Sequence, residues 1–251
     1  MKKLAVLLIS GWAHGVEAMY PLADVMRDSH PVSSFSLAEL LMQGKREDSL
    51  NGAISAYARA ISRHLDESGE PACIVGWSTG GLVAIEAAAN NPEKVAALVL
   101  LSTTARFCSA KEYTSGADPA ALRAMIRKLK RNPEELLADF FSQAVLPMTI
   151  PEDELVCRTQ IALKQGIDSL VHGLEYLAQV DLRDALPAIS VPCLIIHGRQ
   201  DRIVPWQAAR FLTSNLPLSN AEFSPSAGHF LIEQCPKDLI QRIAQFVGPL
   251  R

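Results

Sequence analysis

The 251-residue chain lacks an excess of basic residues, because 27 Asp and Glu outweigh 24 Lys and Arg and leave a formal net charge of −3. Proteins that bind nucleic acid usually carry net positive charge, so we expect no nucleic-acid partner. The chain also lacks any apolar run near the about 18 residues that a membrane-spanning helix needs. We therefore expect a soluble protein with no membrane partner.

Cysteine is scarce and scattered. The five cysteines are widely spaced without a Cys-x-x-Cys pair, which argues against a disulfide framework or a zinc site. None of the six histidines stands four residues from another, so we expect no metal and no cofactor. Reduced thiols favour a cytoplasmic location. The apolar run at 4–9 is only six residues long, shorter than the roughly 7–15 residues of a signal peptide, and predicts a first strand instead.

What the chain does contain is the pattern of one α/β domain. Four short apolar runs are continuous rather than alternating, which is typical of buried parallel strands. They cover residues 4–9, 72–77, 95–101 and 192–197. Helical patterns cover 49–65, 81–90, 208–216 and 236–247, with a short strand near 221–223. Strands that alternate with helices predict a mostly parallel, doubly wound sheet.

Residues 105–186 interrupt this alternation. They contain no clear strand, are rich in helix-forming residues and are broken at Asp118-Pro119, Asn132-Pro133 and Ile150-Pro151. We interpret this segment as a helical lid inserted into a core formed by 1–104 and 187–251.

The pentapeptide Gly76-Trp77-Ser78-Thr79-Gly80 has the Gly-x-Ser-x-Gly form of a nucleophile turn. In that turn the chain passes sharply from strand to helix, and side chains at the two glycine positions would obstruct it. Here a predicted strand precedes the turn and a predicted helix follows it. Ser78 is therefore the candidate nucleophile.

A serine hydroxyl needs a base to accept its proton and an acid to orient that base. Asp201 follows the strand at 192–197, and His229 follows the last strand, which gives the order Ser, acid, His. Asp181 and Asp184 lie before that strand and Glu233 lies after His229, so we interpret these three as solvated or capping carboxylates. His197 is interpreted as a packed residue at a strand end.

A tetrahedral intermediate needs N–H donors near its oxyanion. We expect these donors to be the backbone N–H groups of Thr79 and Trp12. The side chains of Trp12 and Trp77 are predicted to wall an apolar pocket. Aromatic residues Phe107, Phe140 and Phe141 are candidates for an acyl channel beneath the lid, although such residues are more often core.

These residues resemble the α/β-hydrolases and, within them, the BioH type, which cleaves the methyl ester of pimeloyl-acyl-carrier protein in biotin synthesis. The likeness runs through segments 11–12, 76–84, 92–99, 107–110, 173–177 and 180–183. It implies the triad Ser78, Asp201 and His229, an oxyanion hole at Trp12 and Thr79, and an acyl carrier protein as partner.

The chain also departs from that family. Ser10 stands where the family has histidine, and 30–41 lacks the usual Asp-x-x-Gly-x-Gly-x-Ser. Acidic residues stand at 134, 135 and 139, where the family presents arginines to the carrier. A compensating basic face is predicted one helix earlier, at Arg123, Arg127, Lys130 and Arg131, with Lys128 nearby. A solvated outer face is the alternative interpretation.

The sequence thus predicts a monomeric serine carboxylesterase that acts through an acyl-enzyme. Thioester hydrolysis, carbon–carbon bond hydrolysis and a menaquinone-pathway type of elimination are open to the same triad, because the pocket decides the reaction. A binding protein without catalysis and a lid that only binds an acyl carrier are the two non-enzymatic alternatives.

Overall fold

The computed structural model describes residues 3–44 and 54–249. Its centre is a six-stranded sheet in which all neighbouring strands are parallel, in the order β2-β1-β3-β4-β5-β6. The strands are β1 (Ala5–Ile9), β2 (Val32–Phe35), β3 (Ala72–Trp77), β4 (Val95–Leu101), β5 (Cys193–Gly198) and β6 (Ser219–Ser224). The order doubles back at β1 and β3, as in a doubly wound sheet, and the predicted fold class is confirmed.

Burial follows position in the sheet. Every residue of β3 and β5 is buried, whereas the edge strand β6 is mostly half-buried. The four predicted central strands lie within one residue of their expected bounds, and the strand predicted at 221–223 extends to all of β6. Strand β2 was not predicted, because its short sequence Val-Ser-Ser-Phe carries two polar residues and it pairs with β1 alone.

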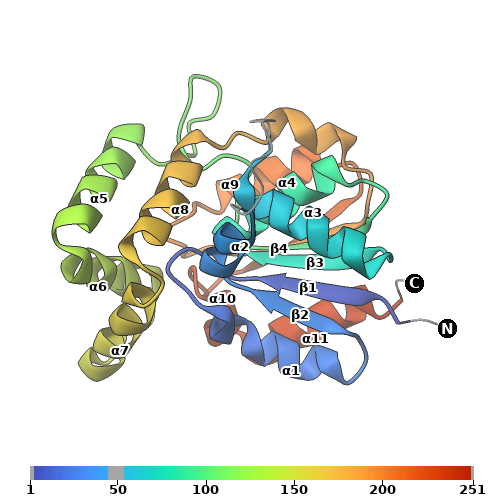
Figure 1. Cartoon of the computed structure of the whole chain (residues 1–251), viewed down its shortest axis with the longest axis horizontal. Helices are drawn as coiled ribbons and strands as arrows, with labels where there is room; N and C mark the ends of the chain where they lie inside the picture. Colours follow the sequence, from blue (N-terminus) through green and yellow to red (C-terminus); the bar gives the residue numbers. More distant parts are fainter. Residues whose placement is uncertain (1–2, 45–53, 250–251) are drawn as a thin grey trace.

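Helices cover both faces of the sheet. In Figure 1, α3 and α4 lie above the sheet and α1 and α11 lie below it. The bounds are α1 (Tyr20–Arg27), α2 (Leu37–Gly44), α3 (Ala56–Ser68), α4 (Thr79–Asn90), α9 (Gln207–Asn215), α10 (Leu231–Gln234) and α11 (Pro236–Val247). The helix predicted at 49–65 begins only at Ala56, capped by the Ser55 hydroxyl, and its positions 49–53 lie outside the described residues.

Four further helices stand between β4 and β5 in the chain: α5 (Pro119–Arg131), α6 (Pro133–Ala144), α7 (Glu152–Leu163) and α8 (Ile167–Gln179). Figure 1 shows them beyond the carboxyl ends of the strands. The prolines at 119 and 133 occupy the first helical positions, and Asp118 caps α5. The division of the chain at 104 and 187, and a lid function for this insertion, stay predictions. No helix in the described ranges is long and apolar enough to cross a membrane.

Candidate active site

Ser78 stands at the sharp turn between β3 and α4. Its backbone has φ 55° and ψ −121°, a strained conformation for a residue with a side chain. A Cβ atom on Gly76 would lie 2.4 Å from the Gly80 carbonyl oxygen, and one on Gly80 would lie 2.4 Å from the Ile9 carbonyl oxygen. Only glycine fits at these two positions, so the pentapeptide determines the turn that presents the serine.

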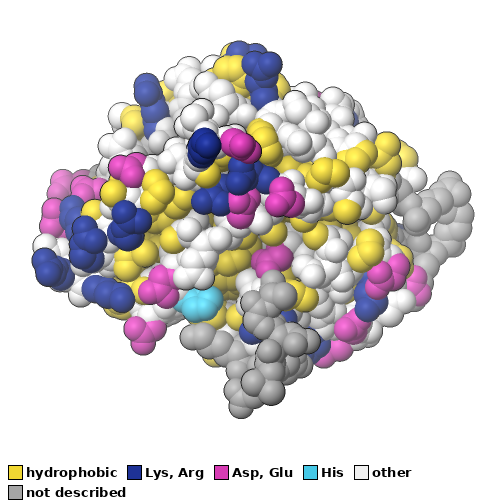
Figure 2. Space-filling model, turned by 90° about the horizontal axis from the view of Figure 1, so that it is seen from above, with side chains coloured by type: hydrophobic (Ala, Val, Ile, Leu, Met, Phe, Trp, Pro, Cys, Tyr) yellow, Lys and Arg dark blue, Asp and Glu magenta, His cyan; other side chains and the backbone are white. Residues whose placement is uncertain are grey.

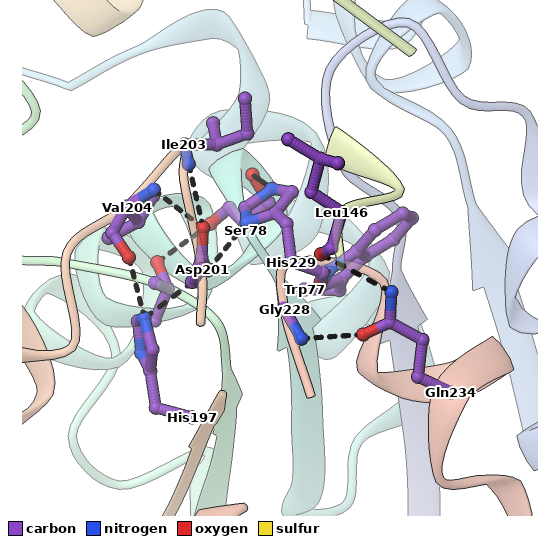
Figure 3. Close-up of polar contacts among 11 residues, drawn as sticks. Trp77, Ser78, Leu146, His197, Asp201, Ile203, Val204, Gly228, His229 and Gln234 are labelled. Atoms are coloured by element: carbon purple, nitrogen blue, oxygen red, sulfur yellow. Dashed lines mark hydrogen bonds and ion pairs between the residues drawn. The ribbon is translucent and has the colours of Figure 1, made fainter. Parts of the chain in front are cut away.

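The structure brings Ser78, His229 and Asp201 together from three separate parts of the chain (Figure 3). The Ser78 hydroxyl lies 2.9 Å from Nε2 of His229, and Nδ1 of His229 lies 2.8 Å from Oδ2 of Asp201. His229 and Asp201 are buried, whereas Ser78 is half-buried. This geometry allows the imidazole to accept the serine proton while its other nitrogen donates to the carboxylate.

Asp201 is held by more than the triad. Its Oδ1 accepts hydrogen bonds from the backbone N–H groups of Ile203 and Val204, both at 2.8 Å. His197 is fully buried, and its Nε2 lies 3.3 Å from Oδ2 of Asp201 and 2.8 Å from the Val204 carbonyl. Burial acts to raise the pKa of Asp201, but the neighbouring His229 and the hydrogen bonds from both imidazoles outweigh it and keep that pKa below its ordinary value.

The backbone around His229 is fixed from two sides (Figure 3). Nε1 of Trp77 donates to the His229 carbonyl at 3.0 Å. Gln234 accepts from the Gly228 N–H at 2.6 Å and donates through Nε2 to the Val145 carbonyl at 2.7 Å. The histidine segment is therefore joined both to the nucleophile turn and to the end of α6. Sequence analysis missed Gln234, because a glutamine in a short helix carries no motif.

The two residues predicted to form the oxyanion hole, Thr79 and Trp12, line the same cavity as Ser78. Thr79 is the first residue of α4, and the first N–H groups of a helix have no partner within it. A Cβ atom on Gly11 would lie 3.1 Å from Cβ of Ser78, so the loop that leads to Trp12 passes directly beside the serine. The Ser10 hydroxyl donates to the His14 carbonyl at 3.1 Å and so closes this loop without the family's histidine.

A cavity of about 160 Å³ opens beside Ser78. Its wall is mostly apolar and includes Trp12, Phe107 and Phe140, three of the five predicted pocket residues. The placement of Trp77 and Phe141 in the pocket was wrong. Both are buried against the His14 ring, at centroid distances of 4.5 and 5.3 Å, outside the cavity wall. Trp77 instead supports the His229 backbone.

His14 is a second feature that sequence analysis missed. Its Nδ1 donates to the Trp12 carbonyl at 2.8 Å, and its Nε2 is buried without a hydrogen-bond partner. The rings of Trp77, Phe141 and Phe230 surround it at 4.5 to 5.3 Å. Burial lowers the pKa of His14 to about 3, so this imidazole is neutral near pH 7.

Two of the three competing carboxylates, Asp181 and Glu233, form ion pairs away from the Ser78 site. Asp181 forms ion pairs with Arg106 and Arg183, which lower its pKa to about 2. Glu233 pairs with Arg158 of α7 at 2.8 Å and so joins the insertion to α10. The 3–44 and 54–249 ranges hold no group of three or more His, Cys, Asp or Glu placed to bind a metal.

The predicted basic face lies on α5. Its four residues are exposed, namely Arg123, Arg127, Lys130 and Arg131. The nearby Lys128 instead pairs with Glu135 at 2.9 Å and Asp139 at 2.6 Å. The acidic residues of α6 thus neutralise one lysine and leave the outer cations of α5 exposed. Contact with a carrier stays a prediction.

Comparison with known proteins gives one family. The alpha/beta hydrolase fold family matches residues 5–236. Relatives named pimeloyl-[acyl-carrier protein] methyl ester esterase include that of Xylella fastidiosa, 30% identical over 89% of this chain and 86% of the relative. The Vibrio cholerae relative is 28% identical over the same shares, and the Vibrio atlanticus relative is 32% identical over 66% of each chain. That last match spans slightly less than two thirds of the relative's length.

Solved structures agree on the fold. A bromoperoxidase from Bacillus anthracis superposes with a TM-score of 0.86 at 17% identity, and an esterase from Exiguobacterium antarcticum with 0.84 at 18% identity. Each match covers 98% of this chain and 92% of the other. At these identities the likeness establishes the architecture alone.

Proposed function

Because the chain belongs to the alpha/beta hydrolase family, we propose that it is a serine carboxylesterase whose substrate is the methyl ester of a pimeloyl group on an acyl carrier protein. One observation carries the catalytic part of this proposal. The Ser78 hydroxyl, the His229 ring and the Asp201 carboxylate form a continuous hydrogen-bonded chain with links of 2.9 and 2.8 Å.

In the proposed reaction the Ser78 oxygen attacks the ester carbonyl while His229 accepts the hydroxyl proton. The ionised Asp201 holds the ring and stabilises the imidazolium that forms. The tetrahedral intermediate collapses, His229 returns the proton to the departing alkoxide, and an acyl-enzyme remains. Water then attacks that acyl-enzyme by the same steps, which releases the acid and restores Ser78. These steps use only side chains of this chain and require no cofactor.

The backbone N–H groups of Thr79 and Trp12 are proposed to donate to the oxyanion. Removing one such donor typically costs about 10²–10³ in rate. Support comes from the helical position of Thr79 and from the approach of the Gly11 loop to Ser78.

The substrate part of the proposal is supported by the names of the relatives and by two structural features. The cavity wall is mostly apolar, which suits an alkyl chain. Helix α5 lines the cavity with Leu122 and Met125, while its outer side carries the exposed basic face. We propose that the insertion is a lid, that the carrier docks on α5, and that the protein acts as a cytoplasmic monomer with its five free cysteines reduced.

Replacement of Ser78 by alanine tests the catalytic proposal. We expect Ser78→Ala to lower hydrolysis of p-nitrophenyl esters by at least about 10⁴-fold and to abolish labelling by a fluorophosphonate probe. The exposed Ser214→Ala on α9 is the matched control and should keep both. Hydrolysis that survives in Ser78→Ala, with an unchanged melting temperature, would refute the assignment.

The substrate is tested with a panel of esters and the wild-type protein. The pimeloyl-carrier methyl ester should be hydrolysed with a higher kcat/KM than short free esters. Equal kcat/KM values across the panel would indicate a general carboxylesterase and would contradict the proposed carrier-bound substrate.

A further inference from the structure

The cavity beside Ser78 has a charged residue in its otherwise uncharged wall. Of the described residues that line it, Arg202 alone carries a formal charge, and the others are apolar or hydroxyl-bearing. Arg202 is also exposed to solvent. Its side chain therefore belongs both to the cavity and to the surface, as expected of a residue at the cavity mouth.

Other arginines of this region have partners. Arg106 and Arg183 share the carboxylate of Asp181, and Arg158 pairs with Glu154 and Glu233. Arg199 and Arg210 lie over the Trp206 ring at 4.9 and 5.7 Å. For Arg202, the described residues provide no hydrogen bond, ion pair or ring contact. A guanidinium has five N–H donors, so these remain available to a ligand.

The backbone at Arg202 is fixed by the catalytic acid itself. Asp201 accepts hydrogen bonds from the two N–H groups that directly follow Arg202, at Ile203 and Val204 (Figure 3). The Cα atom of Arg202, from which the side chain extends, is therefore held at a constant position relative to Asp201. A cation at a fixed position in an apolar cavity favours ligands of a particular length. The distance from the ester carbonyl to the charged group of the ligand must match the distance from Ser78 to the cation.

We propose that Arg202 binds an oxyanion at the far end of the acyl chain, so that the site prefers esters whose alkyl chain ends in a carboxylate or a phosphate. This inference rests on the proposed Ser78-dependent ester hydrolysis and goes beyond it. It adds free esters with an anionic end to the carrier-bound ester, whose acyl group is joined to the carrier at its far end and carries no such charge there. In this arrangement the ester carbonyl lies beside Ser78, the methylene groups pack against the apolar wall of the cavity, and the terminal oxyanion binds the guanidinium of Arg202. Arginine suits this role because its planar fork binds carboxylate and phosphate oxygens in pairs.

The surroundings favour an anion at this mouth. Helix α5, which supplies Leu122 and Met125 to the same cavity, carries the exposed basic face on its outer side. In Figure 2, Lys and Arg side chains gather at the left-hand end of the molecule, the end that α5 and α6 form in Figure 1. The positive charge of that face adds to the attraction that Arg202 exerts on an approaching anion.

The test compares three methyl esters with acyl chains of equal length that end in a carboxylate, a phosphate or a methyl group. For the wild type we expect KM for the preferred charged ester to be about tenfold lower than for the neutral ester, the effect of one charged hydrogen-bonded pair. In Arg202→Gln this ratio should fall to about one, and Arg202→Lys should restore part of it. Comparing the carboxylate with the phosphate identifies which oxyanion the mouth prefers.

The matched control is Arg199→Gln, which removes the same charge from an exposed residue of the same loop outside the cavity wall. It should keep the wild-type ratio. A wild type without charge preference, or an Arg202→Gln that loses the charged and neutral esters equally, would overturn the inference while Ser78-dependent hydrolysis still stood. Absence of any Ser78-dependent hydrolysis would overturn the proposed function as well.

Discussion

His14 lies among three aromatic rings beside the turn that carries Ser78. One of its nitrogens donates to the Trp12 carbonyl, while the other has no hydrogen-bond partner and no access to water. The ring packs on Trp77, which in turn donates to the His229 carbonyl. A buried imidazole thus packs on the tryptophan that holds the His229 backbone, and burial lowers the pKa of His14 to about 3.

This burial predicts how stability depends on pH. The pKa of His14 falls from 6.5 to about 3 on folding, so between these values the unfolded chain holds a proton that the folded chain excludes. The free energy of unfolding therefore decreases as pH falls below about 6.5. For this residue the loss reaches about 2 kcal/mol at pH 5. His14→Asn keeps a donor for the Trp12 carbonyl and cannot take up this proton.

Urea unfolding at pH 7.5 and pH 5 measures the effect. The wild type should lose about 2 kcal/mol more than His14→Asn between the two pH values, because the other titrating groups are common to both proteins and cancel. Parallel losses in the two proteins would show that His14 is protonated in the folded state. Each protein is compared with itself at the two pH values, so a difference in stability between the wild type and the variant at pH 7.5 does not affect the result.

The proximity of Ser78, Asp201 and His229 could be predicted from sequence because three residue types stand in a fixed order after predicted strands. Trp77, His197 and Gln234 could not be assigned in the same way. Trp77 was expected in the pocket, but its indole N–H turns toward the His229 carbonyl. His197 is the packed residue near a strand end that was predicted, but its position 3.3 Å from the Asp201 carboxylate was not predicted. Both interactions join residues whose relative orientation depends on the fold, which local pattern does not encode.

An ion pair and a hydrogen bond join the insertion to the histidine segment. Arg158 of α7 pairs with Glu233 of α10, and Gln234 reaches the Val145 carbonyl at the end of α6. Gln234 also accepts a hydrogen bond from the Gly228 N–H, next to His229. The end of α6 and the position of His229 are thus linked through one side chain.

Replacing Gln234 by methionine tests this link. The variant keeps the side-chain length but loses the hydrogen bonds of Gln234 to the Gly228 N–H and to the carbonyls of Val145 and Leu146. We therefore expect kcat for a small ester to fall about tenfold, with a smaller change in KM. The rate of fluorophosphonate labelling should fall with kcat. Gln241→Met, at an exposed position of α11, is the control. A change in KM alone would place the effect in the cavity instead of in the histidine segment.

The elements themselves were predictable where hydrophobicity is continuous. Strand β3 is apolar throughout, and β5 has a polar residue only near its end, at His197. Strand β2 forms by pairing with β1 and could not be predicted from the sequence Val-Ser-Ser-Phe. Helix α4 begins at Thr79, two residues earlier than predicted, because helical geometry starts directly after the strained Ser78. Tertiary pairing and backbone strain decided these cases.

At the scale of the whole molecule, charge is unevenly distributed. The chain is net negative at −3, yet four exposed cations gather on α5 above the cavity. Such a local field attracts an acidic partner and weakens as salt screens it. Carrier-bound and free esters should therefore respond differently to the same change in charge, because only the carrier-bound ester brings the partner proposed to bind this basic face.

The double variant Arg127→Glu and Lys130→Glu reverses two of these cations. We expect it to raise KM for the pimeloyl-carrier ester about tenfold or more, with little effect on a small free ester. Addition of salt should raise the wild-type KM for the carrier ester and have a weaker effect on the double variant, because less attraction remains to be screened. Reversal of two exposed cations elsewhere, Arg210→Glu with Lys237→Glu on α9 and α11, is the matched control. Equal losses for the carrier and free esters would show that α5 acts on the cavity and not on the carrier.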